Sequence, residues 1–203
     1  MISYRETNLK KILIICAAAL LIGVGFIAKS AIDKFNKPQT PEEIEQELMA
    51  DCNKLIDAEI AVISGNMIFV PSNFFNDLSS KKLEIQSIPP EEGWVLFGLT
   101  KEGKLLKEVE IPASVEDKPV VGLFSGAFFL CPNLVSVTIP DTICFVFNNA
   151  FLDCPKLQSI TSSAAFFDAV GGVNSPIFVD CHISEWNYSG DGMEVEFGFR
   201  PLE

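Results

Sequence analysis

Cys131 and Cys154 are the residues of this sequence whose type and spacing most directly suggest chemistry. They occupy the same place in two similar segments, 23 residues apart. If these segments stack as neighbouring coils about 4.8 Å apart, a disulfide between the two cysteines is within reach. A cysteine at an equivalent repeat position is also typical of a small, inward-facing apolar side chain. We expect buried thiols, and the disulfide remains the alternative.

The other cysteines and the only histidine give no sign of a metal or catalytic site. Outside residues 12–28 the chain has five cysteines, an odd number without a C-x-x-C pair, so neither a disulfide framework nor a zinc site is indicated. Cys181 precedes His182, but adjacent residues on a strand point to opposite sides and do not form a nucleophile–base pair. The motifs G-x-S-x-G and H-E-x-x-H are absent. We therefore predict no catalytic residue, no cofactor and no metal, and hence no enzyme.

Composition limits the class of protein and its partners. A length of 203 residues with 48% hydrophobic residues allows one domain with attachments. The formal net charge is −12, and lysine and arginine occur only as scattered residues and pairs. Nucleic-acid binding requires a concentrated basic surface, so no nucleic-acid partner is expected.

The two cysteine segments belong to an internal repeat. "AFFLCPNLVSVT" (127–138) and "AFLDCPKLQSIT" (150–161) are identical at seven of twelve positions. A third, partial copy precedes them, because "LKEVEIP" (106–112) aligns with "LVSVTIP" (134–140). Recurring leucine and isoleucine at a period of 20 to 29 residues are typical of a leucine-rich solenoid, whose units stack and share one core. The aligned apolar columns are Leu106, Leu134 and Leu157; Val109, Val137 and Ile160; and Ile111 with Ile139, which ends at Ser162.

This repeat resembles the BspA-like (Treponema pallidum-type) leucine-rich repeat, whose unit reads roughly I-G-x-x-A-F-x-x-C-x-x-L-x-x-V-x-I-P. The segment "IPASVEDKPVVGLFSGAF" (111–128) is also similar to the lead-in of that family. The resemblance covers about residues 94–163. It implies a surface protein used for adhesion and protein binding, with repeats that are not catalytic. The residues that carry it are Ala127, Phe128, Cys131, Leu134, Val137, Ile139 and Pro140, then Ala150, Phe151, Cys154, Leu157 and Ile160.

Phe124 and Phe147 depart from the family pattern, because they stand where the repeat has glycine. The rings either pack beneath a flanking segment or form an exposed aromatic patch that a partner could contact. We expect packing, since a short solenoid needs covering surface and exposed rings are a liability. The exposed patch remains the alternative.

The repeat also predicts a candidate protein-binding face. We expect parallel strands near 106–111, 134–139 and 157–161. Since side chains alternate along a strand, the residues between the apolar columns point outward. This face is small and polar, and acidic at its N-terminal end. Alternatively, serine and threonine occur on this face only because they suit exposed strand positions, and the face binds no partner. The outward residues are Glu108, Ser136 and Ser159 in one row, and Glu110, Thr138 and Thr161 in the next.

The N-terminal region contains a candidate membrane segment. Residues 12–28, "ILIICAAALLIGVGFIA", have no charged side chain, and seventeen helical residues reach about 25 Å, the short end of what spans a bilayer. Lysines flank the run on both sides. "AKS" (28–30) would also serve as a signal-peptide cleavage site. We favour a permanent anchor, with the long C-terminal part carried across the membrane.

The segment after the apolar run predicts an amphipathic helix that ends near Glu59. Thr40 and Glu43 form a capping box, and Pro41 suits the first helical position. The acidic face of this helix either contacts a partner or is simply solvated. "IAVI" and "MIFV" predict short strands, and "WVLFGL" and "KLLKEVEI" flank "TKEG" as a predicted hairpin.

Together these features predict an α+β chain in which an anchor or signal helix and an amphipathic helix precede a short solenoid with a small parallel sheet. The expected divisions are a tail (1–11), the anchor or signal segment (12–28), a linker (29–40), a helix with an N-terminal cap region (41–93), the repeats (94–163) and a C-terminal cap (164–203). The expected function is a membrane-anchored or secreted recognition or adhesion module on the extracytoplasmic side, with an unknown protein partner. The alternative is a scaffolding subunit of an envelope complex.

Overall fold

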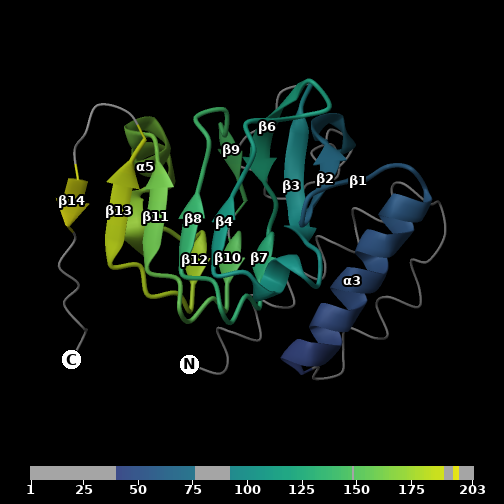
Figure 1. Cartoon of the computed structure of the whole chain (residues 1–203), viewed down its shortest axis with the longest axis horizontal. Helices are drawn as coiled ribbons and strands as arrows, with labels where there is room; N and C mark the ends of the chain where they lie inside the picture. The colour runs from purple at the N-terminus through teal and green to yellow at the C-terminus, as the bar shows by residue number, and fades with distance from the viewer. Residues whose placement is uncertain (1–39, 76–91, 148, 190–193, 197–203) are drawn as a thin grey trace.

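The computed structural model describes residues 40–75, 92–147, 149–189 and 194–196 (Figure 1). The predicted anchor or signal segment, 12–28, lies outside the described residues. Within the described ranges, no helix combines the length and the apolar character needed to cross a bilayer.

Helix α3 spans Pro41–Asp57 and begins with the capping box that the sequence predicts. The backbone N–H of Thr40 donates to Glu43 Oε2 (2.8 Å), and the backbone N–H of Glu43 donates to Thr40 Oγ1 (3.3 Å). The helix ends at Asp57, two residues before its predicted end at Glu59. Cys52 and Leu55 are buried, so the C-terminal half of the helix packs on the rest of the molecule.

The strands before the repeats form as predicted, but the predicted "TKEG" hairpin is wrong. Strands β1 (Val62–Ser64) and β2 (Met67–Pro71) pair antiparallel. Strand β3 (Trp94–Leu99) pairs with β2 and β6 (Lys118–Leu123), whereas β4 (Glu108–Glu110) pairs with β8 (Ser136–Thr138) in another sheet. The chain between β3 and β4 turns through the 3-10 helix η2 (Gly103–Leu105). Because β2 and β6 occupy the two edges of β3, neither edge is left for β4.

The repeats wind into coils, and each coil contributes strands to sheets that run along the molecule. Sheet I has the order β1-β2-β3-β6, with β9 (Phe145–Val146) paired to β6; sheet II is β7-β10-β12; sheet III is β14-β13-β11-β8-β4. The short strand β5 (Ser114–Val115) also pairs with β6. The strands of sheet II are β7 (Phe128–Phe129), β10 (Phe151–Leu152) and β12 (Phe178–Val179), and those of sheet III include β8 (Ser136–Thr138), β11 (Ser159–Ser162), β13 (Glu185–Tyr188) and β14 (Glu194–Glu196).

The predicted parallel strands of the solenoid are confirmed, in the predicted register. Within sheet III, β4 pairs with β8 and β8 pairs with β11, all parallel. Ser136 lies opposite Glu108 on one side and opposite Ser159 on the other. The apolar columns therefore stack as the sequence alignment indicates.

The parallel sheets continue beyond residue 163, where the sequence indicated a cap. Strand β12 pairs with β10, and β13 pairs with β11, so residues 177–188 form a further coil. Helix α5 (Ala164–Val170) and the 3-10 helix η3 (Gly172–Asn174) fill the part of this coil that β6 and β9 occupy in the coils before it (Figure 1). Ser163 starts α5, because its Oγ accepts a hydrogen bond from the backbone N–H of Phe166 (3.1 Å).

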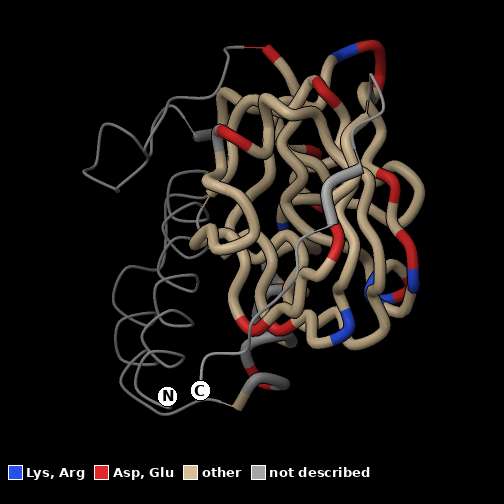
Figure 2. The backbone as a smooth tube through the Cα atoms, turned by 90° about the vertical axis from the view of Figure 1, so that its left-hand side faces the viewer, with Lys and Arg blue, Asp and Glu red and all other residues tan. Residues whose placement is uncertain are grey.

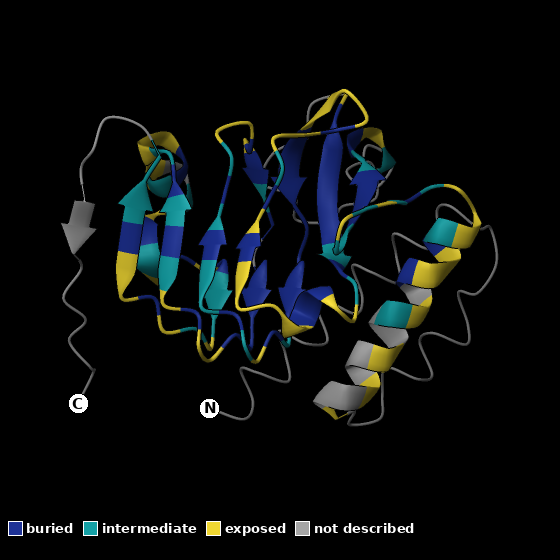
Figure 3. Cartoon of the chain, in the orientation of Figure 1, coloured by how far each residue is buried: buried dark blue, intermediate teal, exposed yellow. Residues whose placement is uncertain are grey.

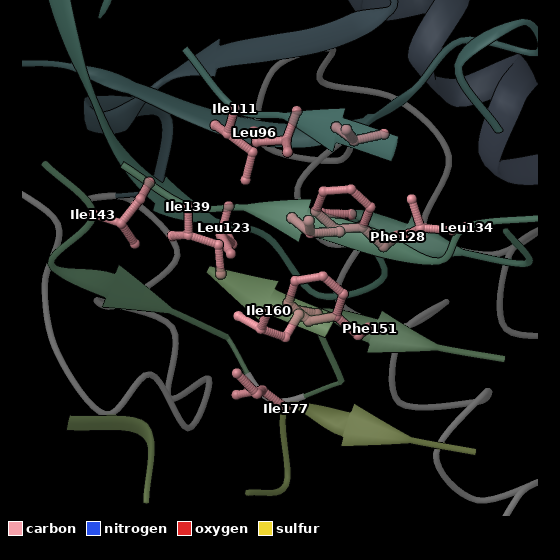
Figure 4. Close-up of a cluster of buried hydrophobic side chains, with 14 of the residues drawn as sticks. Leu96, Ile111, Leu123, Phe128, Leu134, Ile139, Ile143, Phe151, Ile160 and Ile177 are labelled. Atoms are coloured by element: carbon pink, nitrogen blue, oxygen red, sulfur yellow. The ribbon is translucent and has the colours of Figure 1, made fainter. Parts of the chain in front are cut away.

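The main core lies inside the coils, between the sheets (Figure 4). The rings of Phe128 and Phe151 stack with centroids 4.6 Å apart and planes at 7°. Leu134 and Leu157 are fully buried, whereas Leu106 in the same column is 37% exposed. The difference arises because β4 ends sheet III, so only one neighbouring coil covers Leu106.

A second core lies on the other face of sheets I and II. Alternate residues of the same strands divide between the two cores, as Leu96 faces the first and Phe97 the second. Cys52 and Leu55 of α3 belong to the second core. The inner strands of sheets I and II are therefore largely buried on both faces.

The turn between β5 and β6 offers a stabilising substitution. Glu116 and Asp117 both have positive φ (48° and 62°), as a type I′ turn requires, and both are exposed. Asparagine followed by glycine suits these angles best. We expect Glu116→Asn combined with Asp117→Gly to raise the free energy of unfolding by about 1 kcal/mol, measured by urea denaturation. Glu116→Gln removes one of these two charges without relieving the backbone, and should leave stability unchanged.

Candidate protein-binding face

The outer side of sheet III carries the polar side chains that the repeat pattern predicts for it. Ser136, Thr138, Ser159 and Thr161 are half-buried, and Glu108 and Glu110 at the edge strand are exposed. The register aligns them in two rows: Glu108, Ser136 and Ser159, then Glu110, Thr138 and Thr161. Figure 3 shows these strands with buried residues between less buried ones, which is the alternation of a sheet with one polar face.

Strand β13 extends both rows by one residue that the sequence analysis did not include. Glu185 lies opposite Ser159, and Asn187 lies opposite Thr161. The amide of Asn187 donates from Nδ2 to Ser159 Oγ (3.2 Å) and to Glu185 Oε1 (3.2 Å), which holds the two strands' side chains together. The face was expected to be acidic at its N-terminal end, and the exposed Glu185 adds an acidic side chain beyond Ser159 as well.

A sequence signal for this extra coil exists, but it is out of step with the repeat. "FVDC" (178–181) repeats "FLDC" (151–154). The strand then begins five residues after Cys154 but four residues after Cys181. Because of this one-residue deletion, counting from the cysteine places Ser184 in the leucine column, whereas the strand register places the buried Ile183 there. The preceding "SAAFFDAVGGV" contains helix α5.

Few basic side chains surround this face. Figure 2 shows that acidic positions are more numerous than basic ones along the described chain. Lys156 is exposed at the turn before β11 and donates from Nζ to Asn133 Oδ1 (3.2 Å) in the neighbouring coil. Beyond the other end of the strands, Ser189 Oγ donates to Asp141 Oδ1 (2.9 Å). Polar contacts between coils therefore border the face on both sides.

Phe124 and Phe147 are packed, as expected, and do not form the alternative exposed patch. Their exposed fractions are 0% and 7%. Phe124 stacks on Phe97 with centroids 4.6 Å apart, and its ring meets the edge of Phe147 at 5.0 Å. Both rings belong to the second core, together with Leu55 of α3. Where the family's repeat has glycine, this chain thus has a phenylalanine that packs in the same core as the end of α3.

The repeat cysteines form a column of three thiols that lines one corner of the coils. Cys131 and Cys154 are buried and Cys181 is half-buried. Each follows a residue in the left-handed region: Leu130, Asp153 and Asp180 have φ of 52°, 57° and 54°.

These thiols donate to backbone carbonyls of the corner. Cys154 Sγ lies 3.1 Å from Phe128 O in the preceding coil, and Cys181 Sγ lies 3.7 Å from Phe151 O in the same way. A small donor at this position therefore links adjacent coils, which explains the repeated cysteine. Cys131 and Cys154 are free, buried thiols, as expected.

Contacts within the thiol column shift the pKa values of Cys154 and Cys181 in opposite directions. Hydrogen bonding with Cys131 and Cys181, followed by burial, raises the pKa of Cys154 well above its usual value. The pKa of Cys181 is lowered, chiefly because the Cys154 thiol hydrogen-bonds to it, although burial acts in the other direction. Cys181 is therefore the member of this pair that ionises first.

The described ranges contain no group of three histidine, cysteine, aspartate or glutamate side chains placed to hold a metal ion. His182 is exposed and precedes β13, whereas Cys181 points into the thiol column.

Comparison with known proteins relates the coiled part of the chain to a family. The model for the BspA type leucine rich repeat region matches residues 101–194, in 6 copies. This part of the chain is therefore similar in sequence to the BspA-type leucine-rich repeats. The match runs past residue 163 and includes the coil at 177–188.

Two solved structures are similar to the chain. A leucine-rich repeat protein from Bacteroides capillosus has 16% identity and a TM-score of 0.37, over 64% of this chain and 99% of that one. A leucine rich cell surface protein from Faecalibacterium prausnitzii has 21% identity and a TM-score of 0.34, over 60% of this chain. This chain covers 32% of that second protein. No curated protein matches the chain.

Proposed function

We propose that this protein is a non-catalytic recognition module that binds another protein through the outer face of sheet III. One observation carries the proposal: the inner strands of sheets I and II have their outer faces buried in the second core, whereas sheet III presents a polar face. A sheet face that continues across several coils offers a partner an extended, repeated surface, which is how solenoids commonly bind.

The chemistry of the face suggests the kind of partner segment that it accepts. Ser136, Thr138, Ser159 and Thr161 have short side chains with hydroxyl groups, which donate and accept hydrogen bonds and let a partner approach closely. Glu108 and Glu185 are exposed in the same row, on either side of Ser136 and Ser159. A segment with polar groups in its middle and lysine or arginine toward its ends would be complementary to this surface.

The membrane location is a further part of this proposal. If residues 12–28 anchor the chain and the rest crosses the membrane, sheet III would face the outside of the cell, where it could serve adhesion. Protease treatment of intact cells tests this arrangement, with antibodies to an epitope at the C-terminus. Loss of the epitope is expected, and its protection until the cells are lysed would contradict the outside location.

The binding face is tested by four substitutions to lysine, at Ser136, Thr138, Ser159 and Thr161. Four long cations on the row positions would block close approach and repel a basic partner segment. Partners are crosslinked on intact cells and recovered with the wild-type or variant chain. We expect the partner recovered with the wild type to be lost from the variant, whose thermal unfolding should remain cooperative.

A matched control adds the same charge elsewhere on the surface. Ala113, Thr142, Ala165 and Asn174 are exposed and lie outside the face, so their substitution by lysine should leave partner recovery unchanged. Equal recovery with both lysine variants would show that sheet III is not the binding face. The origin of the recovered protein then separates recognition of foreign proteins from a scaffolding role within the envelope.

A further inference from the structure

The thiol column is a cluster of nucleophilic side chains for which the proposed binding function has no use. Phe128, Phe151 and Phe178 lie opposite one another in the parallel strands of sheet II. Each is followed three residues later by a cysteine, so Cys154 stacks between Cys131 and Cys181. Stacked strands lie about 4.8 Å apart, within the Cα separation that a disulfide spans.

Access to this column differs from one end to the other. Cys131 and Cys154 have exposed fractions of 1% and 0%. Cys181 is half-buried and belongs to the last coil, after the edge strand β12. A reagent in solution therefore reaches Cys181 first, and finds there the thiol that the neighbouring Cys154 helps to ionise.

We propose that Cys181 and Cys154 form a redox pair, in which Cys181 reacts with a small-molecule disulfide and Cys154 completes an intramolecular disulfide. The Cys181 thiol loses its proton to solvent, and the thiolate attacks one sulfur of the reagent. A mixed disulfide forms and one small thiolate leaves. Cys154 then loses its proton and attacks the sulfur of Cys181, which releases the second small thiolate. Two protein thiols are oxidised and one reagent disulfide is reduced to two thiols.

The chain contains a matched control thiol in Cys144. It is exposed, and its Sγ donates to Val121 O (3.6 Å). Its neighbour in the preceding coil is Val121, whereas the neighbour of Cys181 in the preceding coil is another cysteine, Cys154. Reaction at Cys144 should therefore stop at the mixed disulfide, whereas reaction at Cys181 should go on to the intramolecular bond.

The test treats the reduced full-length chain with oxidised glutathione and maps its peptides under non-reducing conditions. In the wild type we expect a peptide that joins Cys154 to Cys181 and a glutathione adduct on Cys144. In Cys154→Ser, the adduct should remain on Cys181. In Cys181→Ser, Cys154 should stay a free thiol, because it is fully buried. Circular dichroism checks the fold of each variant, and Cys154→Ala replaces the serine variant if that one does not fold.

Three results would overturn the proposal. The first is a stable glutathione adduct on Cys181 in the folded wild-type protein. The second is a peptide that joins Cys131 to Cys154 before any bond to Cys181 appears. The third is modification of Cys144 while Cys181 remains free. None of these results depends on a binding partner, so the outcome is independent of the recognition function proposed above.

Discussion

Replacing Phe151 by alanine is expected to lower the free energy of unfolding by about 3–5 kcal/mol, a large part of the stability of a domain of this size. Phe151 has an exposed fraction of 0% and lies in the middle of the aromatic stack. Its ring centroid is 4.6 Å from that of Phe128 and 5.1 Å from that of Phe178. Removing this ring therefore leaves a cavity in the core, and the rings of Phe128 and Phe178 each lose a stacking partner.

Urea denaturation followed by far-ultraviolet circular dichroism measures this loss. Ile63 provides the control, because it is 52% exposed in β1 and Ile63→Ala should change stability by less than about 1 kcal/mol. Equal effects of the two substitutions would be incompatible with a shared core between the coils.

Replacing Trp186 by alanine is expected to cost a similar amount, about 3–5 kcal/mol. Trp186 is fully buried and lies opposite Ile160, so it fills the inward position of the last coil. Its Nε1 donates to Ser162 Oγ (2.9 Å), and its ring contacts Phe167 of α5 with centroids 4.9 Å apart. The loss tests whether the last coil is an integral part of the solenoid.

Two milder substitutions separate packing from hydrogen bonding at this position. Trp186→Phe keeps much of the apolar volume but leaves Ser162 without its donor, and should cost less than the alanine variant. Ser162→Ala leaves the buried indole N–H without an acceptor, at a cost of about 1–3 kcal/mol. If Trp186→Ala instead produced a separate early transition and an unchanged main one, the last coil would be an independent unit.

The register of the solenoid could be predicted from sequence because successive coils pack in the same way. Once Leu134 aligns with Leu157, the pairing of β8 with β11 follows, along with the outward row that contains Ser136 and Ser159. The same reasoning identified the buried cysteines. The burial of Leu106 was overestimated, because an alignment does not show that β4 is the end of its sheet.

Pairings outside the repeat could not be predicted in this way. The sequence around "TKEG" has the local signals of a hairpin, but β3 finds its partners in β2 and β6, which lie farther along the chain in both directions. Long-range packing thus overrode a local turn signal. Glu185 was missed for a different reason, since one deleted residue shifted its strand out of the repeat alignment.

The spacing of paired strands also has a consequence for how the chain folds. Opposite residues in sheet III are 28 residues apart between Glu108 and Ser136, 23 between Ser136 and Ser159, and 26 between Ser159 and Glu185. Each coil therefore closes a loop of nearly equal entropy, and no pairing in this series of parallel strands must wait for a distant part of the chain. Folding of this region is expected to start at one coil boundary and spread to the next, so its rate should depend little on the number of coils.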